Sequence, residues 1–143
     1  MPAAIREVFL HVHVRKCGGS TFHTQMLKRN FGAGYYRDAS LLDDRYSAEQ
    51  MSMILDRCDW LQAYSSHKIS LDLPYERTSD RIWAIVFVRD PVARFLSHYF
   101  YLRNHPKSWD QRSRELTIAQ YVEHAIANRL LETERQHGQL QHL

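Results

Sequence analysis

A glycine-containing turn near the start of the chain combines residue types that can bind an anion. Its residues are Arg15, Lys16, Cys17, Gly18, Gly19, Ser20 and Thr21. Two adjacent glycines permit a tight turn, and the backbone N–H groups of such a turn, with the N-terminus of a following helix, favour negative charge. Lys16 adds a cation there. The run suggests a phosphate cradle, although an ordinary tight turn would use the same residues and the lysine precedes the glycines, unlike in a Walker loop.

A second pair of side chains suggests another anion site much later in the chain. Arg89 follows a run of apolar residues, and Ser97 lies in the helix predicted after it. Arginine offers a forked set of donors that suits a phosphate, and serine adds a hydroxyl. The alternative is an arginine paired with Asp80 or Asp90 and a serine on a solvated helix face. Two anion sites, each at the end of a predicted strand, suggest a ligand that carries two separated phosphates.

The first anion site is predicted to connect a strand to a helix. Residues 7–14 are dense in β-branched and aromatic types, which predicts a buried strand. Ser20 or Thr21 can cap the helix that follows the glycines. The apolar face of that helix is expected to consist of Phe22, Met26 and Leu27.

The second anion site follows the same pattern. Residues 82–88 are all apolar, which is typical of a strand covered on both faces. Asp90 as a cap and Pro91 in the first turn then predict a helix that extends to about Arg103. Its apolar positions are Val92, Phe95, Leu96, Tyr99 and Leu102.

The remaining segments alternate in the same way and predict a fold class. We expect a loop over residues 30–47, a helix over 48–58, a short strand over 60–64 followed by Ser65, Ser66 and His67, a loop over 71–80, a polar loop over 104–114, a helix over 117–131 and a polar tail. Alternating strands and helices predict a three-layer, P-loop-like α/β fold with a central parallel sheet. In such sheets a ligand binds at the carboxyl ends of the strands, where both anion sites and His67 are predicted.

Composition limits the function classes. The 143 residues suit one domain, and a formal net charge of +3 is too small to predict a nucleic-acid partner. The two cysteines have neither zinc spacing nor a disulfide framework, which suggests a reducing, cytoplasmic location. No apolar run is long enough to predict a membrane segment, and the first residues do not resemble a signal peptide.

Two stretches resemble the signatures of a known family. Residues 13–22, HVRKCGGSTF, resemble the H-x-P-K-[TC]-G-G-[ST] loop of the carbohydrate sulfotransferases related to heparan sulfate 2-O-sulfotransferase. Residues 86–99, VFVRDPVARFLSHY, resemble the second signature of that family, R-D-P-x-x-R-x-x-S-x-Y. Their order and separation agree with the family. Arg15 stands where the family usually has proline, and Ser66 stands where it commonly has glycine.

The resemblance implies an enzyme that moves a sulfuryl group from 3′-phosphoadenosine 5′-phosphosulfate (PAPS) to a hydroxyl of a carbohydrate and releases 3′-phosphoadenosine 5′-phosphate (PAP). Lys16, Arg15 and the N–H groups of residues 17–21 would hold the 5′-phosphosulfate, and Arg89 and Ser97 the 3′-phosphate. Lys16 would also relieve charge on the leaving oxygen, so that no metal is required in principle. His67 matches the position of the family's catalytic base, with Asp72 and Glu76 as substitutes.

Several alternatives stay open. The family usually continues beyond this length, so we expect one sulfotransferase-like domain over residues 1–143 that lacks part of the family's C-terminal region. A domain that binds PAPS or PAP without catalysis, or a phosphotransferase like the nucleotide kinases, are the competing functions. His11, His13 and Cys17 are a less favoured zinc set. Tyr35, Tyr36, Tyr46, Tyr99 and Tyr101 either line an acceptor groove or, as we favour, serve in packing.

Overall fold

The computed structural model describes residues 5–39, 45–70, 77, 79–105 and 112–127, and the predicted segments outside these ranges lie beyond the description. The chain divides into two compact units, with the division between Phe87 and Val88. Each unit is described by itself. The expectation of one domain over residues 1–143 stays a prediction.

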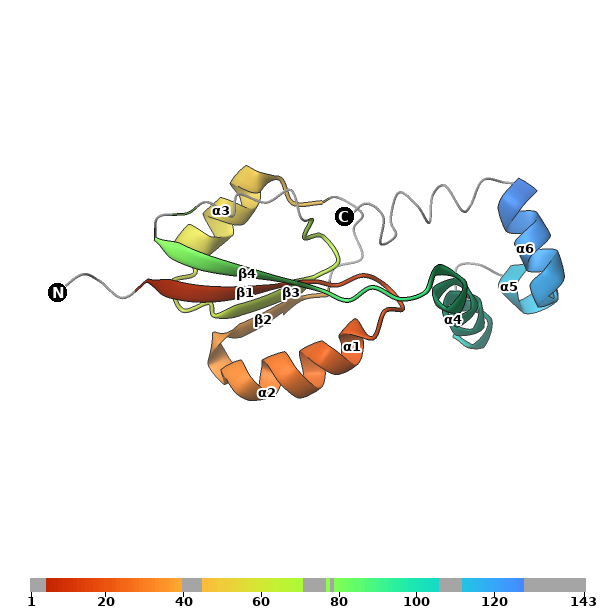
Figure 1. Cartoon of the computed structure of the whole chain (residues 1–143), viewed down its shortest axis with the longest axis horizontal. Helices are drawn as coiled ribbons and strands as arrows, with labels where there is room; N and C mark the ends of the chain where they lie inside the picture. The colour runs from red at the N-terminus through yellow and green to blue at the C-terminus, as the bar shows by residue number, and fades with distance from the viewer. Residues whose placement is uncertain (1–4, 40–44, 71–76, 78, 106–111, 128–143) are drawn as a thin grey trace. The chain divides into compact units, whose positions relative to one another are not determined.

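The first unit is built on a parallel sheet with the first strand inside it (Figure 1). Its strands are β1 (Arg6–Val12), β2 (Tyr35–Asp38), β3 (Ala63–Ser66) and β4 (Asp80–Val86). Their order is β2-β3-β1-β4, and every neighbouring pair runs parallel. This confirms the predicted α/β class with a central parallel sheet.

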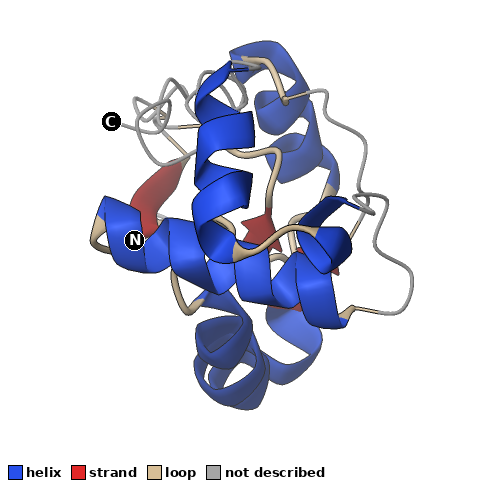
Figure 2. Ribbon diagram, turned by 90° about the vertical axis from the view of Figure 1, so that its right-hand side faces the viewer, coloured by secondary structure: helices blue, strands red, loops and turns tan. Residues whose placement is uncertain are grey.

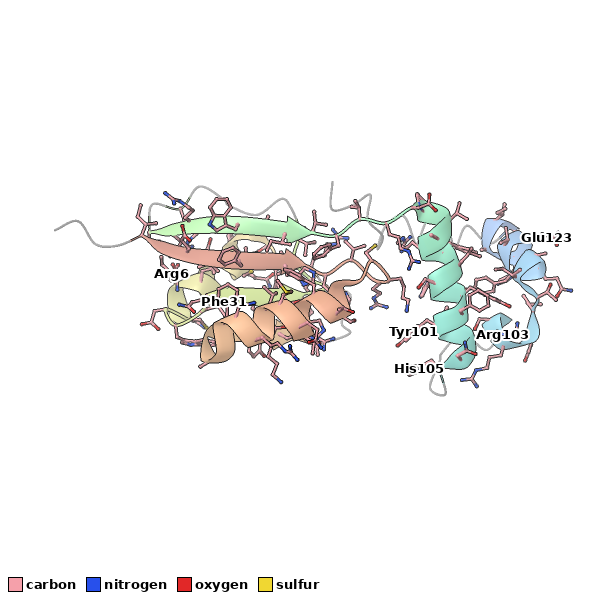
Figure 3. The ribbon with its side chains drawn as sticks, turned by 60° about the horizontal axis from the view of Figure 1, so that its bottom comes forward. Arg6, Phe31, Tyr101, Arg103, His105 and Glu123 are labelled. Atoms are coloured by element: carbon pink, nitrogen blue, oxygen red, sulfur yellow. The ribbon has the colours of Figure 1, made fainter. Side chains whose placement is uncertain are left out.

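Helices cover the two faces of this sheet, because alternate residues of β1 point to opposite sides. Val8, Leu10 and Val12 have no exposed surface and pack in a core with residues of α3 (Ala48–Arg57). On the other face, the Phe9 ring lies 5.2 Å from that of Phe31, at the end of α2 (Lys28–Phe31) and labelled in Figure 3. The three predicted layers are thereby confirmed.

The helix after β1 differs from its prediction at its start and in its middle. It comprises α1 (Gly19–Phe22), a π-helical turn over His23–Leu27 and α2, and its N-cap is Gly18, with no side-chain cap. The predicted caps Ser20 and Thr21 are therefore wrong, because the left-handed Gly18 starts the helix before them. Met26 is 52% exposed, contrary to prediction, while Leu27 is buried. The π turn explains this, since it aligns residues five apart, such as Phe22 and Leu27.

One short strand was missed, and another was predicted with the wrong bounds. β2 lies inside residues 30–47, which we expected to be a loop, and β3 begins at Ala63 rather than at Trp60. β2 pairs with β3 from Tyr35 opposite Ala63 to Asp38 opposite Ser66. A strand of this length is stabilised by its partner rather than by local propensity, so the glycines and aspartates around it hid it in the sequence.

The predicted burial of β4 is also wrong. We expected both faces of this apolar strand to be covered, but of its residues only Asp80 is buried, and Arg81, Trp83 and Ala84 are exposed. Trp83 is 47% exposed and Phe87 36% exposed. The apolar run has a high strand propensity, and that propensity does not show whether helices cover both faces of the strand.

The second unit consists of α4 (Pro91–Asn104), α5 (Arg112–Glu115) and α6 (Ile118–Ala127), with no strand among its described residues (Figure 2). Asp90 caps α4 as predicted, since its Oδ1 accepts a hydrogen bond from the Ala93 N–H at 2.8 Å. The Tyr99 hydroxyl donates to the Leu116 carbonyl at 2.9 Å. Arg103, labelled in Figure 3, donates to the same carbonyl at 3.1 Å, which ties α4 to the segment before α6.

An ion pair around the buried carboxylate of Asp80 joins the amino ends of β1 and β4 to the end of α3. Arg6 Nε lies 2.8 Å from Asp80 Oδ1, and Arg77 Nε lies 2.8 Å from Asp80 Oδ2. Arg6 also donates to the carbonyls of Leu55 and Cys58, at 2.9 and 2.8 Å. The guanidinium therefore satisfies two carbonyls at the C-terminus of α3 as well as the carboxylate.

We predict that Asp80→Asn lowers the free energy of unfolding by about 3 kcal/mol at neutral pH, because it removes the buried carboxylate that pairs with both Arg6 and Arg77. Arg6 and then Arg77 lower the pKa of Asp80 from its usual 3.8, so this stabilisation is present above pH 3.8 and is lost as the pH falls through the lowered value. Urea denaturation from neutral to acidic pH measures both effects. The exposed pair of Arg81 and Glu7, 3.2 Å apart, provides the control, and Arg81→Gln should change stability by less than about 0.5 kcal/mol. Equal losses in the two variants would contradict the prediction.

Candidate functional site

The loop between β1 and α1 has the backbone that an anion cradle requires. Lys16 and Gly18 adopt left-handed conformations, with φ of 64° and 87°. The carbonyl of Gly18 accepts hydrogen bonds from the N–H groups of Thr21 and Phe22, at 3.2 and 3.3 Å, and closes the first helical turn. Ser20 and Thr21 are exposed at this turn. The N-terminus of the helical segment over residues 19–31 is thus accessible, and the N–H groups of Gly19 and Ser20 precede the first hydrogen bonds of the helix.

Gly19 is required at its position by the histidine beneath it. A Cβ built on Gly19 would lie 2.2 Å from Cδ2 of His13 and 3.0 Å from Cε1 of His11. Both distances are too short for ordinary contacts. The second glycine of the loop therefore permits the helix to begin directly above the His13 ring.

The structure brings His67 beside this loop. His67 follows β3, and its Nδ1 lies 2.5 Å from the backbone carbonyl of His13. A carbonyl can only accept, so Nδ1 carries the proton and, in the neutral ring, Nε2 holds the lone pair. The His67 and His13 rings stack with centroids 4.1 Å apart. His67 is therefore in the tautomer that a base acting through Nε2 needs.

Burial keeps the histidines of this cluster neutral. Desolvation is the largest cause of a pKa of about 2 for His13 and about 4 for His11. Burial also lowers the pKa of His67, while the hydrogen bond to the His13 carbonyl raises it. Arg15 and Arg37 lower it further, while Asp38 raises it. All three rings are neutral at pH 7, and His67 can accept a proton there.

The zinc alternative finds no support in this geometry. His11 and His13 do share a strand face, as predicted, with ring centroids 5.2 Å apart. His11 Nδ1, however, is engaged with the Ser65 hydroxyl at 2.8 Å. Within the residues that the structure describes, no three histidine, cysteine or acidic side chains are arranged to hold a metal ion.

A polar network at the ends of β2 and β3 was missed by sequence reasoning. Asp38 Oδ2 accepts hydrogen bonds from the hydroxyls of Tyr46, at 2.6 Å, and Ser66, at 3.4 Å, and lies 3.9 Å from Lys68 Nζ. The Tyr46 hydroxyl in turn accepts from Tyr64 at 3.0 Å. The adjacent aromatic residues Tyr35 and Tyr36 could have indicated this strand. A strand that begins there would have placed Asp38 at its end, beside Ser66 and His67.

The other predicted site residues lie in the second unit or outside the description. Arg89 is exposed just before α4, and Ser97 is half-buried on it. Of the carboxylates considered as partners of Arg89, Asp80 binds Arg6 and Arg77, and Asp90 caps α4 through its Oδ1. Tyr99 is buried, which confirms packing for this tyrosine. Asp72 and Glu76 fall outside the described residues.

Comparison with known proteins identifies the family. The family model described as "Sulfotransferase family" matches residues 4–140. The chain belongs to the sulfotransferase family. No curated protein and no solved structure matches it. The match confirms the resemblance at the level of this family. As a sulfotransferase family member the chain is a transferase, and the family implies a nucleotide donor and an acceptor substrate.

Within residues 5–39, 45–70, 79–105 and 112–127, no helix is both long enough and apolar enough to cross a bilayer.

We predict that Gly19→Ala destabilises this sulfotransferase by about 2 kcal/mol, because the new methyl group displaces the buried His13 ring. Gly18→Ala is the matched control: a Cβ there meets nothing within 4 Å, although the φ of 87° still strains the alanine. Its cost should be about 1 kcal/mol. Urea denaturation of the two variants measures the difference. A Gly19→Ala protein as stable as the wild type would contradict the close contact between the loop and His13.

Proposed function

We propose that the chain transfers a sulfuryl group from PAPS to a hydroxyl of a carbohydrate acceptor. The observation that carries this proposal is the place of His67: a neutral histidine in the base tautomer lies beside the glycine loop at the carboxyl edge of the sheet. The family match supports sulfuryl transfer as the reaction. A P-loop-like role for the loop, a relationship to heparan sulfate 2-O-sulfotransferase and a cytoplasmic location belong to the same proposal.

The donor would be held at both ends. In this proposal the N–H groups of residues 17–21 and the side chains of Lys16 and Arg15 bind the 5′-phosphosulfate. The exposed helix start and the left-handed Lys16 and Gly18 support this assignment. Arg89 and Ser97 would bind the 3′-phosphate, and this assignment is supported by the second motif rather than by a distance to the loop.

The chemistry follows from these positions. The acceptor hydroxyl attacks the sulfur in line, forming an O–S bond while the bond from sulfur to the bridging oxygen of the 5′-phosphate breaks. The hydroxyl proton passes to Nε2 of His67. Lys16 stabilises the charge that develops on the leaving phosphate oxygen, and PAP departs. Lys16 and His67 are thus the two catalytic residues of the proposal.

We predict that wild-type protein binds PAP in the micromolar range by calorimetry, and ATP much more weakly at matched salt. Arg89→Ala should weaken PAP binding by roughly tenfold or more, since it removes a charged donor to the 3′-phosphate. Arg81→Gln at the amino end of β4 is the control, and its affinity should equal that of the wild type. A preference for ATP would favour a kinase-like function, and indifference to Arg89 would remove it from the site.

We predict that wild-type protein transfers labelled sulfate from PAPS to members of an oligosaccharide panel, and that His67→Ala slows turnover by roughly a hundredfold or more. The rate should be constant around pH 7 and fall in acid below the usual histidine pKa of 6.5, because burial lowers the pKa of His67 and protonation removes the base. His124→Ala on α6 serves as the control. If His67→Ala transfers sulfate as fast as the wild type, the base assignment is wrong. PAP binding without any transfer would indicate a binding domain.

A further inference from the structure

We propose that His13 is a positioning residue for His67: its buried ring, stacked between His67 and the glycine loop, holds the His67 ring in the orientation in which Nδ1–H reaches the His13 carbonyl and Nε2 faces the bound phosphosulfate. The inference rests on the proposed function, because it names the residue that acts through the base of that reaction.

The backbone of His13 extends the strand pairing up to the base. The register of β1 and β3 ends with Val12 opposite Ser66. One residue later, the His13 N–H donates to the Ser66 carbonyl at 3.0 Å, and the His13 carbonyl accepts from His67 Nδ1 at 2.5 Å. The His67 ring is therefore attached to the same peptide units that continue the sheet.

The side chain of His13 contacts the face of the His67 ring, which the carbonyl of His13 does not reach. Its ring stacks on that of His67 at 4.1 Å with an interplanar angle of 22°. It also lies under Gly19, where a Cβ would approach Nε2 of His13 to 2.6 Å. One ring thus contacts both the base and the start of the phosphate-binding helix. A carbonyl alone would leave the His67 ring able to turn about its side-chain bonds.

His13 itself has no role in proton transfer. It is 5% exposed, and burial followed by the charges of His67, His11, His23 and Arg37 keeps its pKa at about 2. It stays neutral when His67 takes up the acceptor's proton, so no like-charge pair forms in the stack. The His13 carbonyl accepts from the ring N–H and favours the protonated His67. The remaining charged groups that act on His67 are Arg15, Arg37 and Asp38.

The first test is nuclear magnetic resonance of the imidazole nitrogens of His67 in the full chain, which needs no activity. Wild-type protein should show His67 with its proton on Nδ1 and a pKa below 6.5. In His13→Ala the stack is lost, and both tautomers should be populated. The pKa should rise toward 6.5, because burial is the largest cause that lowers it. His23→Ala is the matched control: its ring lies 5.6 Å from His13, and its removal should leave the tautomer of His67 unchanged.

The second test compares turnover in a double-mutant cycle. His13→Ala should reduce kcat by roughly ten- to a hundredfold through misplacement of the base, and move the acidic limb of the pH profile to higher pH. In the His67→Ala background the same change should have little further effect, because His13 acts through His67. A merely structural residue would instead lower kcat equally in both backgrounds.

The outcomes separate this inference from the proposed function. An unchanged tautomer and pKa of His67 in His13→Ala would overturn the inference whatever the activity. An equal loss of kcat from His13→Ala in the wild-type and His67→Ala backgrounds would overturn it too. Absence of sulfate transfer by the wild type would overturn the proposed function, and with it the positioning of a base, even if the nitrogen spectra change. If His13→Ala shows no cooperative thermal unfolding, His13→Gln, which keeps a longer polar side chain, takes its place in both tests.

Discussion

The structure of the first unit depends on the register of β1. Val8, Leu10 and Val12 of this strand have no exposed surface, and β3 and β4 pair with it on both sides. Because side chains alternate along a strand, a slip of one residue would put His11 and His13 into the apolar core and expel the valines. The same register sets Ser66 opposite Val12, so that His67 emerges beside His13. Core packing and the position of the proposed base therefore share one constraint.

The sequence predicted those parts of the fold that have a local cause. The density of β-branched residues predicted β1, and Asp90 with Pro91 predicted the start of α4. The errors have causes that lie elsewhere in the chain. β2 exists because β3 accepts it as a partner, and the exposure of Trp83 depends on which parts of the chain cover its face of the sheet. A run of residues reports its own propensity and does not report which neighbour it receives.

The candidate site likewise has features that the local sequence predicts and features that depend on distant parts of the chain. The rule that ligands bind at the carboxyl ends of parallel strands predicted that His67 and the glycine loop lie at one edge. It did not predict the contact that joins them. His67 and the His13 carbonyl are 54 residues apart in sequence, so their hydrogen bond and ring stacking depend on how β1 and β3 align. For the same reason Asp38 remained unnoticed at the end of a strand that was itself missed.

Two arginines act on the proposed base through their charge. The charges of Arg15 and Arg37 lower the pKa of His67, whereas the buried His11 and His13 are neutral. The arginines attract an anion and at the same time lower the pKa of His67. An anion bound at the loop offsets part of that positive field, and the offset raises the pKa of His67. The proposed base is therefore weakest when the loop is empty and strengthens when a phosphosulfate occupies it.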